Sequence, residues 1–283
     1  MFPTPIERAS PPVQWIYKAG LPVALLIWLA PIIAVALTSI RGQGDLTAGN
    51  YWGIPTEWKI AENYAAVFTN TPILHYIANS FLVTIPTVIG AVALSCLAGF
   101  ALGVYRFKFN LLVFFIFVGG NFVPFQILMV PVRELSLRLG LYDTVTGLVL
   151  FHVAFQTGFC TFFMRNFIRE LPSELIDAAR VEGATEFQIF WRVVLPLVRP
   201  AIAALAVLIF TFIWNDYFWA TVLIQGDHAM PVTGGLKTLN GQWVAQWQLV
   251  SAGSIVAALP PVLIFFLMQK HFIAGLTMGA TKG

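Results

Sequence analysis

Six apolar segments, each long enough to cross a lipid bilayer as a helix, run through most of this chain. They cover about residues 21–40, 75–104, 111–132, 144–164, 200–224 and 249–268. A helix of about 20 residues is about 30 Å long, which matches the hydrocarbon core of a bilayer. Pro31 predicts a kink in the first segment, and Pro124 and Pro131 interrupt the third. We therefore expect an all-α membrane protein with six transmembrane helices.

Composition agrees with lipid as the solvent for most of the chain. Hydrophobic residues make up 58% of the 283 residues, charged residues make up 10%, and the mean hydropathy is +0.80. A soluble globular protein of this length needs far more polar surface. A secretory signal would have a shorter apolar core and a small-residue cleavage site, so we expect residues 21–40 to be the first span.

The Lys and Arg residues predict which ends of the spans lie in the cytoplasm. Five of them lie on one side: Arg41, Lys59, Arg133, Arg138 and Lys237. Eleven lie on the other side: Arg8, Lys18, Arg106, Lys108, Arg165, Arg169, Arg180, Arg192, Arg199, Lys270 and Lys282. Short cytoplasmic connections carry the excess of Lys and Arg, so both termini and the connection at 171–196 are expected inside the cell. The basic residues do not gather with aromatics in a groove, so no nucleic-acid partner is expected.

The connection at 171–196 is charged and has the pattern of two short helices. Gly183 is the expected left-handed residue that ends the first helix. Thr185 and Gln188 stand three positions apart, which is the pattern of a capping box that opens a second helix. Pro196 is expected to end that second helix. The connection is therefore predicted to be a cytoplasmic helix-turn-helix.

The spacing within this helix-turn-helix resembles the coupling motif of ABC importer permeases. Asp177-Ala178-Ala179 is followed after three residues by Gly183, and after nine more by Val193-Val194-Leu195-Pro196. The usual first residue is Glu, so Asp177 shortens the reach of the carboxylate by one methylene. The resemblance implies that a separate ATPase is contacted by Glu174, Asp177, Ala178, Ala179, Arg180, Glu182, Gly183, Leu195 and Pro196. The alternative is an ordinary amphipathic loop whose charges face water.

Further segments resemble the carbohydrate branch of these permeases, and within it the smaller maltose-type subunit. They are Asn63–Phe68, Asn79-Ser80, Leu139–Thr144, Trp214–Asp216 and the ending Ala274–Gly283. The resemblance covers the chain from Asn63 to its end, whereas residues 1–62 match only loosely. The segment Pro231–Leu236 and Leu259-Pro260-Pro261 look most like permeases for glucose, mannose or glucosides.

This resemblance implies a permease subunit of an ATP-driven sugar importer that forms half of the transmembrane path. The implied partners are a second homologous permease, an ATPase dimer that holds ATP and Mg, and a periplasmic sugar-binding protein. The implied location is the bacterial inner membrane, with both termini cytoplasmic. Residues 1–19 would be a cytoplasmic segment, residues 20–272 the transmembrane domain with the coupling loop at about 170–196, and residues 273–283 a cytoplasmic tail.

The chain itself is not expected to bind nucleotide or a metal cofactor. The sequence contains no G-x-x-x-x-G-K-[ST] phosphate loop, so any ATP must be used by a partner. It also offers no catalytic constellation, which weakens the hypothesis of a membrane-embedded enzyme. The main alternative is a self-sufficient secondary sugar transporter or channel, but that class usually shows paired repeats, and no convincing repeat is present.

Two further contact regions are implied by the resemblance. The last outer loop of the maltose-type subunit reaches into the sugar cleft of the binding protein, and the corresponding residues are Leu239, Asn240, Gly241 and Gln242. The C-terminal tail lies against the ATPase pair, which implicates Thr277, Lys282 and Gly283. The alternatives are a flexible connector and a frayed terminus.

Polar residues inside the spans form a candidate sugar path. A lipid-facing Asp216 would cost about 2.5–3.5 kcal/mol at the midplane, so it must face protein or water. His152 and Gln156 are four residues apart and share one helix face. The candidate residues are Trp214, Asn215, Asp216, Tyr217, His152 and Gln156. The alternative role is interhelical hydrogen bonding, including bonds to the partner permease.

Overall fold

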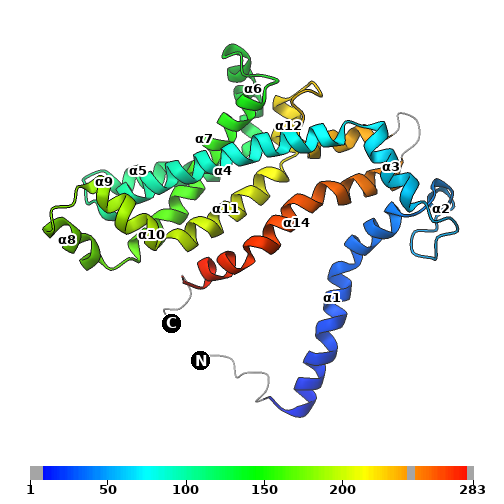
Figure 1. The fold of residues 1–283 in the computed structure, drawn as a ribbon, viewed down its shortest axis with the longest axis horizontal. Helices are drawn as coiled ribbons and strands as arrows, with labels where there is room; N and C mark the ends of the chain where they lie inside the picture. The colour runs from blue at the N-terminus through cyan, green and yellow to red at the C-terminus, as the bar shows by residue number, and fades with distance from the viewer. Residues whose placement is uncertain (1–8, 241–245, 279–283) are drawn as a thin grey trace. The chain divides into compact units, whose positions relative to one another are not determined.

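The computed structural model describes residues 9–240 and 246–278, with side chains described as far as residue 270. The described residues are mostly helical, and their only β-type pairing is an isolated bridge between Arg41 and Trp58. The chain forms two compact units. Unit 1 contains residues 1–71 and 238–256, and unit 2 contains residues 72–237 and 257–283. The helix order can be followed along the colour gradient of Figure 1.

Unit 1 begins with the long helix α1 (Pro11–Ser39), which has an exposed apolar surface along most of its length. This helix starts ten residues earlier than expected and is continuous through Pro22 and Pro31. The short helix α2 (Gln43–Thr47) and the helix α3 (Ile60–Asn70) follow. Helix α3 contains the segment Asn63–Phe68, which is one of the segments that carry the resemblance.

The loop between α1 and α3 is built around the buried Arg41. Its guanidinium donates to the carbonyl of Asn50 at 2.9 Å and to the carbonyl of Gly53. Asp45 lies 3.9 Å from Arg41 and accepts hydrogen bonds from the Thr56 hydroxyl at 2.7 Å and the Thr56 amide at 2.9 Å. The Thr56 hydroxyl is the main cause that lowers the pKa of Asp45. The loop is therefore an ordered polar structure rather than an open connection.

Unit 2 is organised around two helices, α4 (Ile73–Val104) and α7 (Val145–Arg169), which pack side by side (Figure 1). Gly90 packs against Val153 and Gly103 packs against Ile168, which shows that the two helices run in the same direction. Between these contacts, a Cβ added to Gly99 would lie 2.9 Å from the backbone nitrogen of Arg165 on α7. Small residues thus allow the two helices to approach closely, as is common between membrane helices.

The third expected span is broken where Pro124 predicts it. Helix α5 (Asn110–Gly119) and a 3₁₀ turn end at Phe122, and the chain resumes after Pro124 with a second 3₁₀ turn and α6 (Met129–Arg138). The two halves are bent by 88°. Pro131 does not interrupt the helix as expected, because it lies in the first turn of α6, where its missing N–H has no helical acceptor.

The fifth expected span is also not a single helix. Helix α11 (Arg199–Trp214) ends ten residues before the expected boundary, and the short helix α12 (Phe218–Leu223) follows. The last long helix, α14, covers Trp247–Met278 and therefore extends into the tail expected from residue 273. Among the described residues, four helices are long and apolar enough to cross a membrane, or up to six spans if each of two bent pairs counts as one.

Candidate functional site

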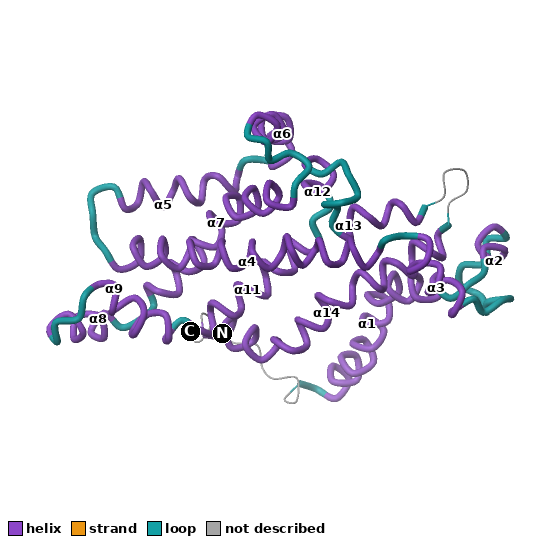
Figure 2. Tube along the Cα trace, turned by 45° about the horizontal axis from the view of Figure 1, so that its top comes forward, coloured by secondary structure: helices purple, strands orange, loops and turns teal. Residues whose placement is uncertain are grey.

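The helix-turn-helix expected at 171–196 lies beyond the ends of α4 and α7 (Figures 1 and 2). It consists of α8 (Ser173–Val181) and α9 (Glu186–Ile189), which continues through a π-helical turn, Phe190–Val194, into α10 (Leu195–Leu197). We call residues 173–197 the foot.

Local rules explain the turn of the foot. Gly183 has φ 83°, as its place after α8 predicts. The predicted capping box is present: the Gln188 amide donates to the Thr185 hydroxyl at 3.3 Å, and the Thr185 amide donates to the Gln188 side chain at 2.8 Å. Pro196 does not end the second arm as expected. It fits in the first turn of α10, and the helical run ends at Val198 instead.

Arg180 links the two arms of the foot through ionic hydrogen bonds. Its guanidinium donates to Asp177 at 3.2 Å and to both carboxylate oxygens of Glu186, at 2.8 Å and 3.3 Å. The Tyr105 hydroxyl, at the end of α4, donates to Glu186 at 2.6 Å. The foot is thereby tied to α4 through one carboxylate, and we call Tyr105, Asp177, Arg180 and Glu186 the foot network.

The foot network also perturbs the ionisation of its members. Hydrogen bonds from Arg180, and next from Tyr105, lower the pKa of Glu186. Burial, followed by the bond to Glu186, raises the pKa of Tyr105 to about 12. Glu186 therefore stays ionised and Tyr105 stays protonated at neutral pH, which keeps the network intact. Sequence reasoning missed Glu186 because it lies in the unspecified nine-residue gap of the motif, and it missed Tyr105 because that residue is far away in sequence.

The outer face of α8 is exposed and holds most of the predicted coupling residues. Ile176 is 6% exposed and anchors the helix, whereas Val181 is 90% exposed. The exposed predicted residues are Glu174, Asp177, Ala178, Arg180, Glu182 and Gly183, and Ala179 is half-buried beside them. Leu195 and Pro196 are half-buried in the second arm. On the second arm, Phe187 (70% exposed) and Trp191 (54% exposed) add apolar surface, which is typical of a protein-binding site.

The break between α11 and α12 places Asp216 where it caps a helix. Its carboxylate accepts hydrogen bonds from the amides of Trp219 at 3.3 Å and Ala220 at 3.0 Å. His152, which is buried on α7, has its Nε2 atom 3.5 Å from the same carboxylate. The carboxylate thus has protein partners, as the cost of a lipid-facing charge requires.

A cavity of about 1020 Å³ brings together five of the six candidate sugar-path residues: His152, Gln156, Asn215, Asp216 and Tyr217. Trp214 does not line it, because its indole N–H donates to the carbonyl of Ala257 at 3.0 Å in the interior of unit 2. Sequence reasoning missed two polar lining residues, Asn121 and Thr211, and several aromatic ones. Such a combination of aromatic faces with amide, imidazole and carboxylate groups suits a hydroxyl-rich ligand.

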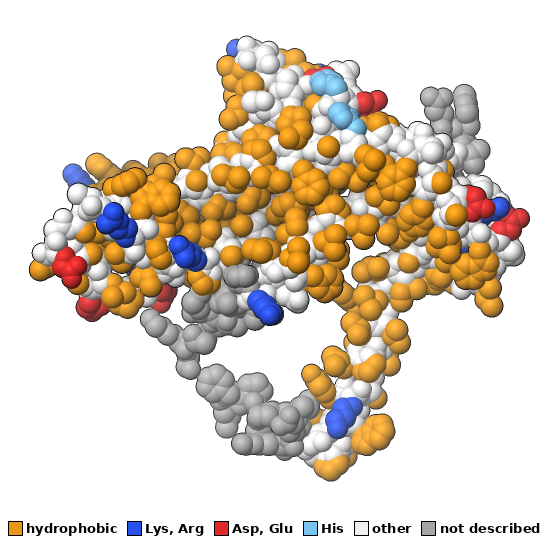
Figure 3. All heavy atoms as spheres, viewed as in Figure 1, with side chains coloured by type: hydrophobic (Ala, Val, Ile, Leu, Met, Phe, Trp, Pro, Cys, Tyr) orange, Lys and Arg blue, Asp and Glu red, His pale blue; other side chains and the backbone are white. Residues whose placement is uncertain are grey.

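At the far end of α4 from the foot, the polar loop 224–231 is bonded to the starts of α4 and α7 through Asn79 and Asp143, and we call it the Asp143 loop. Asp143 accepts hydrogen bonds from the amides of Gln225 at 2.8 Å and Gly226 at 2.9 Å. Asn79 donates to the carbonyls of His228 and Met230, each at 3.1 Å. Although burial opposes ionisation of Asp143, these amide bonds lower its pKa. Figure 3 shows histidine and acidic side chains gathered near this loop.

The remaining predicted contact residues lie mostly outside the described part of the chain. Gly241, Gln242, Lys282 and Gly283 lie outside the described residues, and Thr277 is described only as part of α14. Leu239 is 4% exposed and Asn240 is exposed. Within residues 9–240 and 246–278, no group of three or more His, Cys, Asp or Glu side chains is placed to hold a metal ion.

Comparisons with known proteins give a consistent result. Residues 9–277 match the family described as binding-protein-dependent transport system inner membrane component. The arabinooligosaccharides transport system permease protein of Halalkalibacterium halodurans is 33% identical over 98% of this chain and 99% of its own length.

Two solved structures share the fold. One is a bacterial ABC transporter involved in the import of the acidic polysaccharide alginate, with a TM-score of 0.80 and 23% identity over 96% of this chain and 99% of that one. The other is a bacterial alginate ABC transporter in complex with an alginate pentasaccharide-bound periplasmic protein, with a TM-score of 0.67 and 18% identity over 90% and 92% of the two chains.

Proposed function

We infer the function of this chain from its membership of the family of binding-protein-dependent transport system inner membrane components: it is a permease subunit of an ATP-driven sugar importer. It is a multi-pass membrane protein and a transport subunit, not an enzyme. The sugar class is supported by the relative named for arabinooligosaccharides and by the solved structures of alginate transporters that share the fold.

The proposal that this subunit couples to a separate ATPase rests on the exposed surface of the foot. Its outer face combines acidic side chains with small and apolar ones, so a partner can approach closely. The foot network joins it to α4 through Tyr105 and Glu186. When the ATPases close on ATP and Mg, a docked foot moves with them, and this link transmits the movement to the span.

The cavity beside α7, α11 and α12 supplies this subunit's part of the sugar path. Aromatic side chains line it together with Gln156, Asn215 and Asp216, and these amides and the carboxylate can replace the water around sugar hydroxyls. A second homologous permease would close the other side of the path. His152 Nε2 lies 3.5 Å from the Asp216 carboxylate, so both side chains belong to the same site.

The two ends of α4 define the two sides of the membrane. The helix has 32 residues and is therefore about 48 Å long, so the foot and the Asp143 loop face opposite solutions. We place the foot and both termini in the cytoplasm, where Lys and Arg are in excess. The Asp143 loop and Asn240 then face a periplasmic sugar-binding protein.

The coupling proposal is tested with the assembled importer in vesicles. Ala178→Glu places a longer, charged side chain on the docking face, and we expect sugar uptake and sugar-stimulated ATP hydrolysis to be lost while the subunit still inserts and assembles. Ala48→Glu, an equivalent change at an exposed position in unit 1, is the control and should retain both activities. Normal coupling in Ala178→Glu, or sugar uptake by this chain alone without ATP, would refute the proposal.

A further inference from the structure

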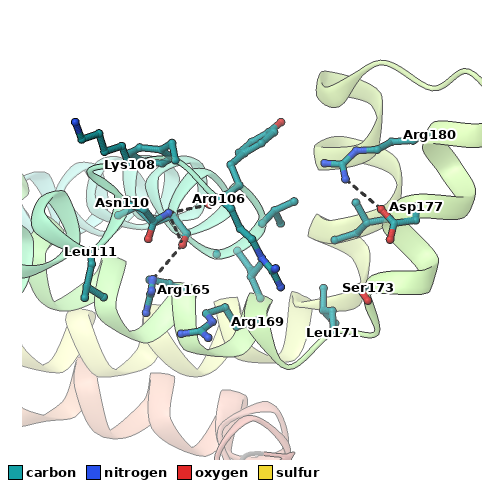
Figure 4. Close-up of a pocket in the computed structure, with 17 residues that line it drawn as sticks. Arg106, Lys108, Asn110, Leu111, Arg165, Arg169, Leu171, Ser173, Asp177 and Arg180 are labelled. Carbon is teal, nitrogen blue, oxygen red and sulfur yellow. Dashed lines mark hydrogen bonds and ion pairs between the residues drawn. The ribbon is translucent and has the colours of Figure 1, made fainter.

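A second cavity, of about 920 Å³, lies between the α4–α5 loop, the end of α7 and α8 (Figure 4). It is lined by five basic side chains, Arg106, Lys108, Arg165, Arg169 and Arg180, and by one acidic side chain, Asp177. In Figure 4, Arg165 and Arg169 lie along α7, and Arg106 extends from the loop toward the space in front of α8. We call this cavity the basic pocket.

Most of this positive charge is not neutralised by the protein. Arg180 is paired with Asp177 and Glu186. Among the described residues, none of the other four basic side chains forms an ion pair with an acid. Because unpaired like charges repel each other across the cavity, an anion bound between them would be stabilised.

Arg165 is the strongest sign that the missing counter-charge is a ligand. Its side chain is buried, with the residue only 6% exposed, and it lines the basic pocket. Its Nε donates to the carbonyl of Leu102 at 3.1 Å, and its guanidinium carbon lies 3.9 Å from the centre of the Phe114 ring. These contacts hold the side chain in place but supply no negative charge. A buried charge without an ionic partner is costly, so a bound oxyanion would offset that cost.

The surroundings of the basic pocket favour a lipid over a soluble anion. The pocket lies where the spans α4 and α7 end, and its lining includes Phe107 and Leu111. Both of these side chains are exposed, at 45% and 59%. The exposed apolar surface continues along α5 with Leu112 at 57% and Phe115 at 59%. A molecule with a phosphate group and acyl chains matches both the charge and the apolar surface that leads away from it.

We propose that the basic pocket binds the phosphate headgroup of an anionic phospholipid, with its acyl chains along the exposed side of α5. Arginine side chains suit this role because the guanidinium group can donate two parallel hydrogen bonds to phosphate oxygens. A lipid at this position would contact the foot directly, because Asp177 and Arg180 of α8 line the pocket. The inference requires membrane insertion of the chain but does not depend on its sugar specificity or on transport.

The test measures lipid binding to the purified full-length chain in detergent by native mass spectrometry. Dioleoylphosphatidylglycerol is compared with dioleoylphosphatidylcholine, which has the same acyl chains but no net charge. The double variant Arg106→Gln/Arg169→Gln changes two exposed side chains, so folding should be retained. Each basic residue near an anionic lipid surface contributes about 1 kcal/mol to binding. The loss of two of them should therefore weaken binding of the anionic lipid about 30-fold.

The matched control is Arg192→Gln/Arg199→Gln, which removes the same charge from exposed positions in the second arm and at the start of α11 that do not line the pocket. It should bind the anionic lipid within about 3-fold of the wild type. Equal weakening in both double variants would show a general charge effect and overturn the proposal.

Three other results would also overturn the proposal. One is equal affinity for the two lipids. Another is displacement of the lipid by millimolar inorganic phosphate, which would identify a soluble-oxyanion site. The third is competition between an assembled ATPase and the lipid, which would assign the pocket to an acidic surface of that partner.

Discussion

The foot network predicts a measurable coupling between two residues that are distant in sequence, Tyr105 and Glu186. Tyr105→Phe removes only the hydroxyl group and keeps the ring, whose centre lies 5.6 Å from that of Phe100. A hydrogen bond to a charged acceptor contributes about 1.5–3 kcal/mol. Because the Glu186 side chain is 45% exposed, solvent screening reduces this contribution, and we expect Tyr105→Phe to lower the free energy of unfolding by about 1 kcal/mol.

A double-mutant cycle with Glu186→Gln isolates this interaction. We expect a coupling energy of about 0.5–1 kcal/mol between the two positions, measured by thermal unfolding of the purified chain in detergent. Tyr142→Phe is the control: it lies in unit 2 outside the foot network, and Arg133 stacks on its ring, a contact that Phe retains. This control should change stability by less than about 0.5 kcal/mol.

The same cycle tests whether the link carries movement. In the assembled importer, we expect both single variants to hydrolyse ATP with weaker stimulation by sugar and to take up less sugar for each ATP. A coupling energy below about 0.3 kcal/mol is indistinguishable from independent sites. That value, together with unchanged uptake per ATP in both variants, would refute the idea that the network connects the foot to α4.

Three further predictions concern the packing of α4 against α7, the cap of α12 and the Asp143 loop. Gly99→Ala should destabilise the chain by about 1–3 kcal/mol in thermal unfolding, because its Cβ would overpack the contact with α7, whereas Gly20→Ala, with open space around it, should not destabilise it. Asp216→Ala should cost about 0.5–2 kcal/mol by removing the cap of α12, and Asp216→Asn should restore most of that loss; equal losses would contradict the capping role. Because the pKa of Asp143 is lowered in the folded chain, its stabilisation should be full at neutral pH and lost as the pH falls below about 4. Melting curves from pH 7 to pH 3 should therefore show a smaller acid-induced loss for Asp143→Asn than for the wild type.

Several features of the fold followed from local sequence rules. The apolar segments predicted membrane helices, and Pro124 predicted the break in the third span. Gly183 and the Thr185–Gln188 pair predicted the turn of the foot, which the structure confirms. Most of the motif residues on α8 also lie on its exposed face. These features depend on residues within about one or two helical turns of each other, so the sequence alone contains the relevant interactions.

Other expectations failed where neighbouring helices decided the outcome. The apolar segment at 200–224 looks like one span, but it is divided into α11 and α12. Asp216 lies at this break, where its carboxylate caps α12 and lies 3.5 Å from His152 Nε2 on α7. Apolarity alone cannot reveal such a break. Trp214 was expected to line the sugar path together with Asn215 and Asp216. Its indole N–H instead donates to the carbonyl of Ala257, and the side chain does not line the cavity.

By itself, the amino-acid sequence determined that this chain crosses the membrane, which of its segments are apolar enough to do so and that a capped helix-turn-helix projects between two of them. Only the tertiary structure decided that Tyr105 reaches Glu186, that His152 faces Asp216 and that unpaired arginines share one pocket. The physical reason is the range of the interactions. Hydrophobic periodicity and capping act within a helix, whereas these pairings require the parallel packing of α4 against α7 at positions such as Gly99, which no local pattern specifies.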